Sequence, residues 1–220
     1  LWFIEGSSDI NRLSELTHGV AGKHTIWHDN ALAASWLPHA RFAGDAGNIY
    51  GVQWRDWQGA NGAKIDQLER LIEGIRSNPH GRRHVLTAWN PAELDQMCLP
   101  PCHIVSQFYV SGGRLSCQMY QRSADMFLGV PFNIASYSLL THMIAQVCGL
   151  AVGDFIHVIG DAHIYHNHFD QVNEQLTRTP LPLATLRLNP AVTDINQFGP
   201  SDIELEGYQC HPAIAAVMAV

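Results

Sequence analysis

The clearest periodic segment of the chain lies between residues 65 and 76, where apolar and charged positions follow the period of an α-helix. The apolar positions fall on one face and the charged positions on the opposite face; the apolar set is Ile65, Leu68, Leu71, Ile72 and Ile75. This spacing predicts an amphipathic helix with a solvated charged face. Asn78-Pro79 should end it, because the residue before a proline avoids the helical conformation.

Period-two alternation marks residues 104–110 and 114–121 as two strands, joined by a hairpin turn at Ser111-Gly112-Gly113. The HVLTAW run after Arg83 and residues 154–159 and 184–188 are also predicted to be strands. Helices are expected at the N-terminal apolar residues 1–4, near 10–16, over the apolar run within 132–150, and over 163–177. Residues 28–42 show no clear period and are interpreted as an irregular excursion, and Asn61-Gly62 as a turn.

Composition indicates one compact domain over residues 1–220, since 46% of the 220 residues are hydrophobic, 15% are charged, and no repeat or linker interrupts them. The net charge of -7 argues against broad binding of nucleic acid or acidic membranes, so an anionic ligand would need a few focused arginines. The 5 cysteines are odd in number and lack the spacing of a small secreted domain. We therefore expect a reducing, cytoplasmic location.

Residues 119–138 concentrate polar side chains more tightly than an ordinary core segment. Arg122, Ser123 and Asp125 lie within four positions, and Gly129-Val130-Pro131 predicts an irregular turn before Asn133 opens a buried helix. A guanidinium and a hydroxyl suit a phosphate, and a carboxamide suits the edge of a base. The alternative is a polar loop held by its own hydrogen bonds, with Asn133 as a helix N-cap and Asp125 paired to Arg122.

Cys102 is a candidate nucleophile because Pro100-Pro101 holds it on a stiff, extended approach. An ordinary cysteine has a pKa of about 8.5, so a useful thiolate needs a nearby positive charge, for which Arg122 is the candidate. A buried structural cysteine is one alternative. A zinc site with Cys98 is disfavoured, because the spacing spans the proline pair and no second cysteine pair exists, so no metal is expected.

These blocks together resemble the thymidylate synthase family. The signature QRSxDxxLGxPFNIASY is matched at Gln121, Arg122, Ser123, Asp125, Leu128, Gly129, Pro131, Phe132, Asn133, Ile134, Ala135, Ser136 and Tyr137. Further similar blocks are LWFIEG, TIW, GDAGNIYGVQWR, LPPCH and GDAHIY, and they cover almost the whole chain. The resemblance implies an α/β (α+β) fold in which a large mixed sheet, flanked by helices, packs against the sheet of a second subunit.

The implied reaction is reductive methylation of dUMP to dTMP, with 5,10-methylenetetrahydrofolate as one-carbon and hydride donor and dihydrofolate as by-product. By resemblance, Cys102 attacks uracil C6, and the other catalytic residues are Arg122, Asn133, Asp125, Tyr50 and His103. The residues implied for dUMP are Arg82, Arg83, Gln121, Arg122, Ser123, Asn133, His163 and Tyr165, of which Arg82 and Arg83 would be donated across a homodimer. The residues implied for folate are Ile26, Trp27, Leu99, Asp125, Leu128, Gly129, Phe132 and Ala219.

Two alternatives remain open at this stage. A nucleotide hydroxymethylase of the same fold would complete the transfer with water instead of hydride, although Asn133 and the bulky Trp27 weigh against it. The second alternative is a nucleotide-binding homologue without turnover. It follows from the start of the chain at Leu1, inside the block LWFI, which suggests a missing N-terminal segment with a phosphate-loop arginine and a catalytic glutamate.

Overall fold

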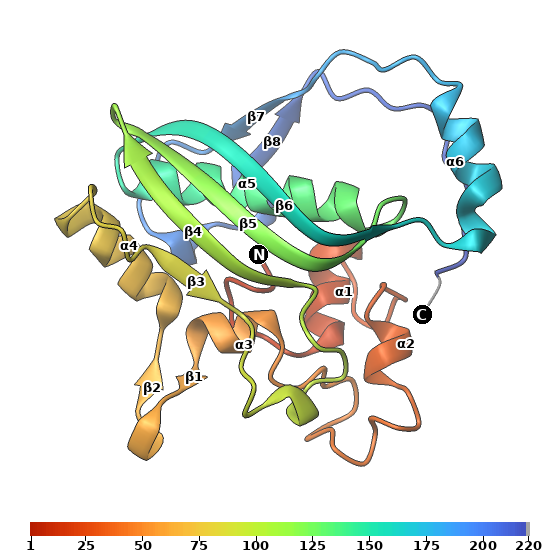
Figure 1. The fold of residues 1–220 in the computed structure, drawn as a ribbon, viewed down its shortest axis with the longest axis horizontal. Helices are drawn as coiled ribbons and strands as arrows, with labels where there is room; N and C mark the ends of the chain where they lie inside the picture. The colour runs from red at the N-terminus through yellow and green to blue at the C-terminus, as the bar shows by residue number, and fades with distance from the viewer. Residues whose placement is uncertain (219–220) are drawn as a thin grey trace.

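The computed structural model describes residues 1–218 and is organised around a four-stranded sheet with the order β3-β4-β5-β6 (Figure 1). The strands are β3 (Val85–Thr87), β4 (His103–Ser111), β5 (Arg114–Asp125) and β6 (Ala151–His163). β3, β4 and β5 pair in antiparallel fashion, whereas β5 and β6 are parallel. The expected α/β class with a mixed sheet is therefore confirmed. Packing of this sheet against a second subunit stays a prediction.

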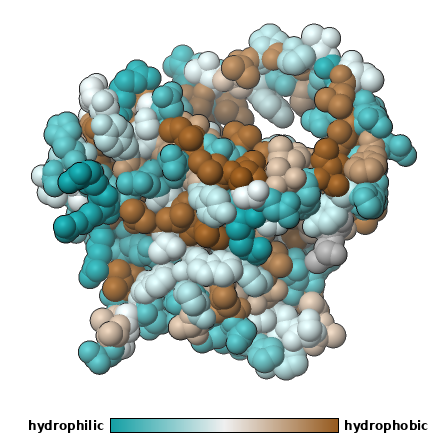
Figure 2. All heavy atoms as spheres, in the orientation of Figure 1, coloured by the Kyte–Doolittle hydropathy of each residue, from teal (hydrophilic) through white to brown (hydrophobic). Residues whose placement is uncertain are grey.

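One face of the sheet is buried, because alternate side chains of β5 point into the core. Leu115, Cys117 and Met119 are fully buried there, and α5 (Gly129–Val147) packs against this side of the sheet. The opposite face carries apolar side chains that stay exposed: Val85, Tyr109, Tyr120, Ile156 and Val158. Figure 2 shows apolar surface gathered on the side of the molecule where β4, β5 and β6 lie in front of α5.

The amphipathic helix is confirmed as α4 (Gln67–Ser77), whose buried side chains are Leu68, Leu71, Ile72 and Ile75. Asp66 caps its first turn by accepting a hydrogen bond from the Glu69 amide, so the helix begins later than Ile65. Ile65 instead belongs to a short hairpin of β1 (Trp57–Gln58) and β2 (Lys64–Ile65), which closes around the expected Asn61-Gly62 turn.

The expectation of a polar loop followed by an irregular turn is wrong. Arg122, Ser123 and Asp125 lie on β5 itself, because parallel pairing with β6 continues as far as the pair Asp125 and His163. α5 then begins at Gly129, and its first turn accommodates Pro131 because the early amides of a helix have no acceptor within it. Asn133 therefore lies inside the helix and is not its N-cap.

Other boundaries also differ from the sequence prediction. The apolar N terminus forms a single turn, closed by a bond of 2.9 Å from the Glu5 amide to the Leu1 carbonyl, rather than a helix. β6 is longer than the expected 154–159, and residues 163–177 divide into the end of β6, η3 (His166–His168) and α6 (Phe169–Leu176). The remaining elements are α1 (Ile10–His18), α2 (His28–Ala31), α3 (Tyr50–Arg55), η1 (Ala60–Gly62), η2 (Leu94–Gln96), β7 (Thr185–Leu188), η4 (Ile195–Gln197), η5 (Pro200–Asp202) and β8 (Ile203–Glu206).

The irregular excursion contains α2 and is fastened at its end by an ion pair between an exposed arginine and a buried carboxylate. Arg41 donates from Nε and Nη2 to the carboxylate of Asp45 at 2.7 and 2.9 Å, and Ser8 adds a hydroxyl donor at 2.6 Å. Asp45 is fully buried, so these bonds replace the water that its charge would otherwise bind. Within residues 1–218, the helices are all too short or too polar to span a bilayer.

Candidate active site

The Cys102 loop is held from two sides. The Cys102 amide donates to the Tyr50 hydroxyl at 2.7 Å, which ties the loop to the start of α3. Arg122 on β5 donates from Nε to the Pro101 carbonyl at 2.8 Å and from Nη2 to the Pro100 carbonyl at 3.1 Å. The predicted thiol and the predicted cation are therefore brought together by contacts with the Pro-Pro pair.

The charge of Arg122 acts on Cys102 in the expected direction but does not dominate. Burial raises the pKa of the Cys102 thiol, and the Arg122 charge and the Tyr50 hydrogen bond only partly offset this, so the pKa stays above its ordinary value. Arg122 is therefore the nearby charge that the sequence predicts, and the role of Cys102 as the attacking residue stays a prediction. At neutral pH the free protein holds Cys102 mainly as the protonated thiol.

Arg122 is also restrained by an aromatic face, which the sequence analysis did not anticipate. Its guanidinium carbon lies 5.5 Å from the ring centroid of Trp89, within the range of a cation–π contact. The proposed ion pair with Asp125 is absent from residues 1–218; Asp125 Oδ1 instead accepts from the amides of Phe127 and Leu128. Asp125 thus shapes the turn that leads into α5.

A chain of side-chain hydrogen bonds fixes the orientation of Asn133. Gln121 Nε2 donates to the Ser123 carbonyl at 2.9 Å and to Asn133 Oδ1 at 3.0 Å, and its Oε1 pairs with His157 Nε2 at 2.9 Å. A backbone carbonyl can only accept, so Gln121 must turn its amide nitrogen toward Ser123. Asn133 must then present its oxygen to Gln121. The sequence analysis did not identify His157 as a site residue. The two-residue alternation along β6 could have placed its side chain on the same face of the sheet as Met119, its partner in the strand pairing.

Aromatic rings pack closely behind the cysteine loop. Tyr50 and His103 stack with centroids 4.0 Å apart, and His103 Nδ1 forms a hydrogen bond of 2.7 Å with the Tyr137 hydroxyl. Burial lowers the pKa of His103 to about 3, and the nearby His157 adds to this effect, so the ring is neutral at physiological pH. Trp27 meets Tyr50 edge-on at 5.9 Å, which links the predicted folate segment to this cluster.

The carboxyl ends of β5 and β6 bring Ser123, Asp125 and His163 to one edge of the sheet. His163 meets the Tyr165 ring in a T-shaped contact at 5.0 Å. Its Nδ1 is buried and makes no hydrogen bond within the described residues, although the carboxylate oxygen Oδ1 of Asp161 lies 3.6 Å from it. A buried ring nitrogen without a hydrogen bond is open to a polar ligand atom.

The predicted folate residues are partly surface-exposed. Ile26 and Phe132 are 58% and 65% exposed, which is high for large apolar side chains, while Leu99, Leu128 and Gly129 are half-buried. Exposed apolar side chains of this kind fit a flat ring system. Ala219 lies outside the described residues.

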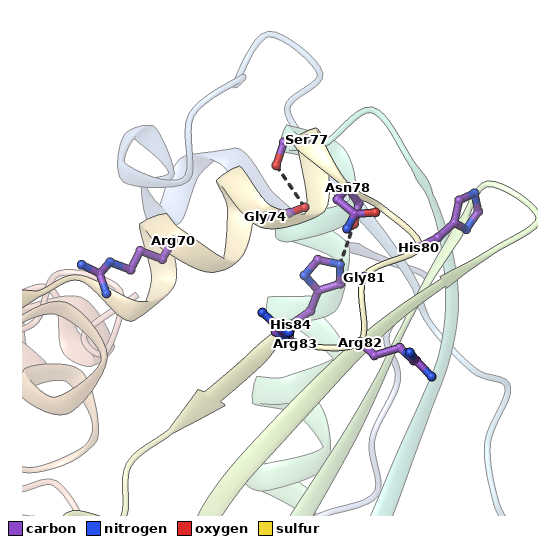
Figure 3. Close-up of a pocket in the computed structure, with 9 residues that line it drawn as sticks. All are labelled: Arg70, Gly74, Ser77, Asn78, His80, Gly81, Arg82, Arg83 and His84. Carbon is purple, nitrogen blue, oxygen red and sulfur yellow. Dashed lines mark hydrogen bonds between the residues drawn. The ribbon is translucent and has the colours of Figure 1, made fainter.

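Arg82 and Arg83 are not brought to Cys102 within the single chain. Both are exposed in the segment between α4 and β3, where they line a groove of about 530 Å³ together with Arg70, Ser77 and His80 (Figure 3). In Figure 3 the Arg82 side chain extends away from that of Arg70, so the cations do not converge on one point. Within residues 1–218, the His, Cys, Asp and Glu side chains form no group of three that could hold a metal ion.

Comparison with known families yields one match over the whole chain. The family model described as thymidylate synthase covers residues 1–220. Its coverage includes the cysteine loop, the Gln121–Asn133 chain and the β5–β6 edge.

Proposed function

Because the chain belongs to the thymidylate synthase family, a family that acts in dUMP methylation with methylenetetrahydrofolate, we propose that it methylates dUMP reductively to dTMP. In this proposal residues 1–220 form a single catalytic domain. Cys102 is the nucleophile that adds to uracil C6, and methylenetetrahydrofolate supplies both the one-carbon unit and the hydride. The observation that carries the proposal is the joint restraint of the Cys102 loop by Tyr50 and Arg122.

The proposed first step needs a thiolate, which the ligand-free site disfavours. Arg122 uses Nε and Nη2 to hold the proline carbonyls, which leaves its other amino group for a phosphate oxygen. We infer that the nucleotide, bound through Arg122 and Ser123, orders the site around Cys102, so that the Cys102 thiolate forms in the bound complex next to uracil C6. Attack on C6 moves electron density to O4 and makes C5 nucleophilic toward the one-carbon donor.

Uracil selection is assigned to Asn133. Gln121 occupies one side of the Asn133 oxygen, so the Asn133 amide nitrogen is free to donate to uracil O4 while the oxygen accepts from N3–H. Cytosine carries a donor and an acceptor in the reverse positions. Reading cytosine would require a flipped Asn133, which would set two amide nitrogens against each other. The Gln121–Asn133 bond therefore supports uracil as the base.

The remaining roles follow the same reasoning. His163, whose buried Nδ1 makes no hydrogen bond within the described residues, and Tyr165 are proposed to bind the sugar 3′-hydroxyl. The apolar side chains of Ile26, Leu128 and Phe132, with Asp125 at their polar edge, are proposed to bind folate, and Trp27 to exclude water from the reacting carbon.

We also propose a homodimer formed by the exposed apolar face of the sheet. Tyr109, Tyr120 and Ile156 lie on that face, and burying them would remove apolar surface from water. Arg82 and Arg83 would then reach the phosphate in the neighbouring site, which explains why the single chain leaves both exposed.

The test is a paired assay of the purified protein with dUMP tritiated at C5 and methylenetetrahydrofolate. Tritium release and dihydrofolate formation should rise together. Cys102→Ala should reduce both by at least about 10³-fold, because no other group can form the C6 bond. Cys98→Ala is the matched control: Cys98 is half-buried in the same segment, burial raises its thiol pKa to about 12, and its loss should leave the rate near that of the parent.

Other results would contradict the proposal. Tritium release without dihydrofolate, together with a hydroxymethyl group at C5 of the product, would identify a hydroxymethylase instead. Tight dUMP binding with neither tritium release nor dihydrofolate would indicate a binding protein without turnover. Cys102→Ala activity equal to that of the parent would remove the nucleophile from the mechanism.

A further inference from the structure

The turn of residues 25–28 is closed by hydrogen bonds in both directions between Thr25 and His28. The Thr25 amide donates to His28 Nδ1 at 2.9 Å, and the His28 amide donates to the Thr25 carbonyl at 3.0 Å. The Thr25 hydroxyl lies 3.0 Å from the same ring nitrogen and accepts from the Trp27 amide at 3.4 Å. This arrangement resembles a helix capping box in which an imidazole replaces the usual glutamate or glutamine. It leads the chain into α2.

The bond from the Thr25 amide fixes the protonation state of His28. A backbone amide can only donate, so Nδ1 accepts with its lone pair and the ring hydrogen lies on Nε2. A protonated ring carries a hydrogen on both nitrogens, and its Nδ1 hydrogen would then face the Thr25 amide hydrogen. Because Thr25 is buried, its amide would lose its acceptor with little access to water. The turn therefore requires neutral His28.

The groups around the ring also favour its neutral form. Burial lowers the pKa of His28, and the neighbouring His24, whose ring centroid lies 5.2 Å away, lowers it further. Asp29 acts in the opposite direction, but its Oδ1 already accepts from His24 Nε2 at 3.0 Å. A further titratable group, His18 at the end of α1, has its Nε2 3.3 Å from the His24 carbonyl. His28 therefore gains its proton only below the ordinary histidine pKa of about 6.5.

The turn carries two residues that have a role in the proposed function. Ile26 and Trp27 lie between the bonded residues, and they are assigned to folate and to the exclusion of water. The Trp27 ring meets Tyr50 edge-on at 5.9 Å, and the Tyr50 hydroxyl holds the Cys102 amide. Any loosening of the turn would therefore change the position of Trp27 relative to the cysteine loop.

Resting on the proposed function, we propose that neutral His28 is a positioning residue: its Nδ1 holds the Thr25 amide and so fixes Ile26 and Trp27 on the folate side of the site. Protonation of the ring in acid releases the turn. Loss of the acceptor should therefore weaken folate binding and admit water to the reacting carbon, while dUMP binding stays unchanged.

Two substitutions of His28 separate the hydrogen bond from the titration. His28→Leu removes the acceptor. His28→Asn keeps an acceptor at the same place, because asparagine Oδ1 and histidine Nδ1 are both bonded directly to Cγ, and the carboxamide does not titrate. His39→Asn is the matched control, since His39 is exposed in the same excursion and stacks on Trp36.

The KM for methylenetetrahydrofolate, kcat and the Kd for dUMP are measured from pH 7 down to about pH 5. The ratio of tritium released from C5 to dihydrofolate formed is measured in the same reactions. An increase in this ratio reports completion of the transfer by water instead of hydride, which a displaced Trp27 would allow. Hydrogen exchange of the peptide that contains Thr25, measured by mass spectrometry at pH 7, reports the amide bond independently of any activity.

We expect His28→Leu to raise both the folate KM and the exchange rate by about ten-fold at pH 7, the effect of losing one hydrogen bond to a buried group. The ratio of tritium to dihydrofolate should rise as well, and the Kd for dUMP should match that of the parent. Below about pH 6 the folate KM of the parent should rise more steeply than that of His28→Asn. His39→Asn should follow the parent at every pH.

A parental folate KM in His28→Leu, unchanged exchange of the Thr25 peptide in that variant, or an equally steep acid rise in the parent and His28→Asn would each overturn the inference. Should His28→Leu fail to fold, the comparison of the parent with His28→Asn across pH still decides. Absence of methyl transfer in the parent would instead refute the proposed function. The exchange rates would then still show whether His28 holds the turn.

Discussion

Replacing Arg41 by alanine should destabilise the protein by leaving a buried carboxylate without its cation. Asp45 is 1% exposed at its side chain, whereas the Arg41 side chain is 55% exposed. Removing one partner of a buried ion pair costs about 3–5 kcal/mol. We expect about 2 kcal/mol here, because water already screens Arg41 and because Asp45 keeps hydrogen bonds from the Ser8 hydroxyl and the Gly47 amide.

The pH dependence gives this prediction its sharpest form. Burial raises the pKa of Asp45, but the hydrogen bonds from Arg41 and Ser8 outweigh it and hold the pKa well below its usual range. A lowered pKa in the folded state adds stability above the unfolded pKa of about 3.9, and this stability is lost as the pH falls. The difference in the free energy of unfolding between the parent and Arg41→Ala should therefore have its full value at pH 7 and should decrease below about pH 4.

The assay is urea denaturation at pH 7 and at several values below pH 4. With a slope of about 2 kcal/mol per molar, the midpoint of Arg41→Ala at pH 7 should fall by about 1 M. Asp45→Asn is the matched control. The double variant should lose less free energy of unfolding than the sum of the two single losses, because either change alone already removes the interaction between the two residues. A destabilisation that is the same at pH 7 and pH 3, or full additivity of the two changes, would refute the reasoning.

Three further predictions address the site and its supports. Alkylation of Cys102 by iodoacetamide in the ligand-free protein should be slower at neutral pH than for an exposed thiol and should rise only above the ordinary cysteine pKa, since burial raises its pKa; a rate plateau already reached at pH 7 would contradict this. Gly47→Ala should lower the melting temperature markedly, because the residue has φ +79 and an added Cβ would lie 2.2 Å from the Gln96 carbonyl oxygen; an unchanged melting curve would show that this turn adapts. Gln121→Leu should weaken dUMP binding by about ten-fold and reduce the ratio of dUMP to dCMP affinity, because Asn133 loses the donor that fixes its orientation. Calorimetry with both nucleotides measures the two affinities.

The amphipathic helix and the two long antiparallel strands could be predicted from the sequence because their signals are local. Apolar spacing of three and four residues specifies the buried face of α4, and two-residue alternation specifies that of β4 and β5. Apart from Arg122, which the need for a positive charge suggested, the residues grouped around Cys102 were named only through the family resemblance. No local pattern tells which of several arginines lies beside a given thiol.

The course of the chain around Arg122 required the tertiary structure. Polar residues followed by glycine and proline usually indicate a loop, yet Arg122 and Asp125 continue β5 because β6 pairs with it in parallel as far as His163. That pairing joins segments distant in the sequence, so local propensity could not reveal it. The same pairing lengthens β6 beyond its apolar core.

The amino-acid sequence by itself determined the class of fold, the buried faces of the regular elements and the family to which the chain belongs. Only the tertiary structure decided that burial outweighs the Arg122 charge at Cys102, that His157 and Gln121 fix Asn133, and that Asp45 pairs with Arg41. The physical reason is that pKa values and amide orientations depend on solvent exclusion and on partners from other elements. The periodicity of a helix or strand, in contrast, depends on residues that are close together in the sequence.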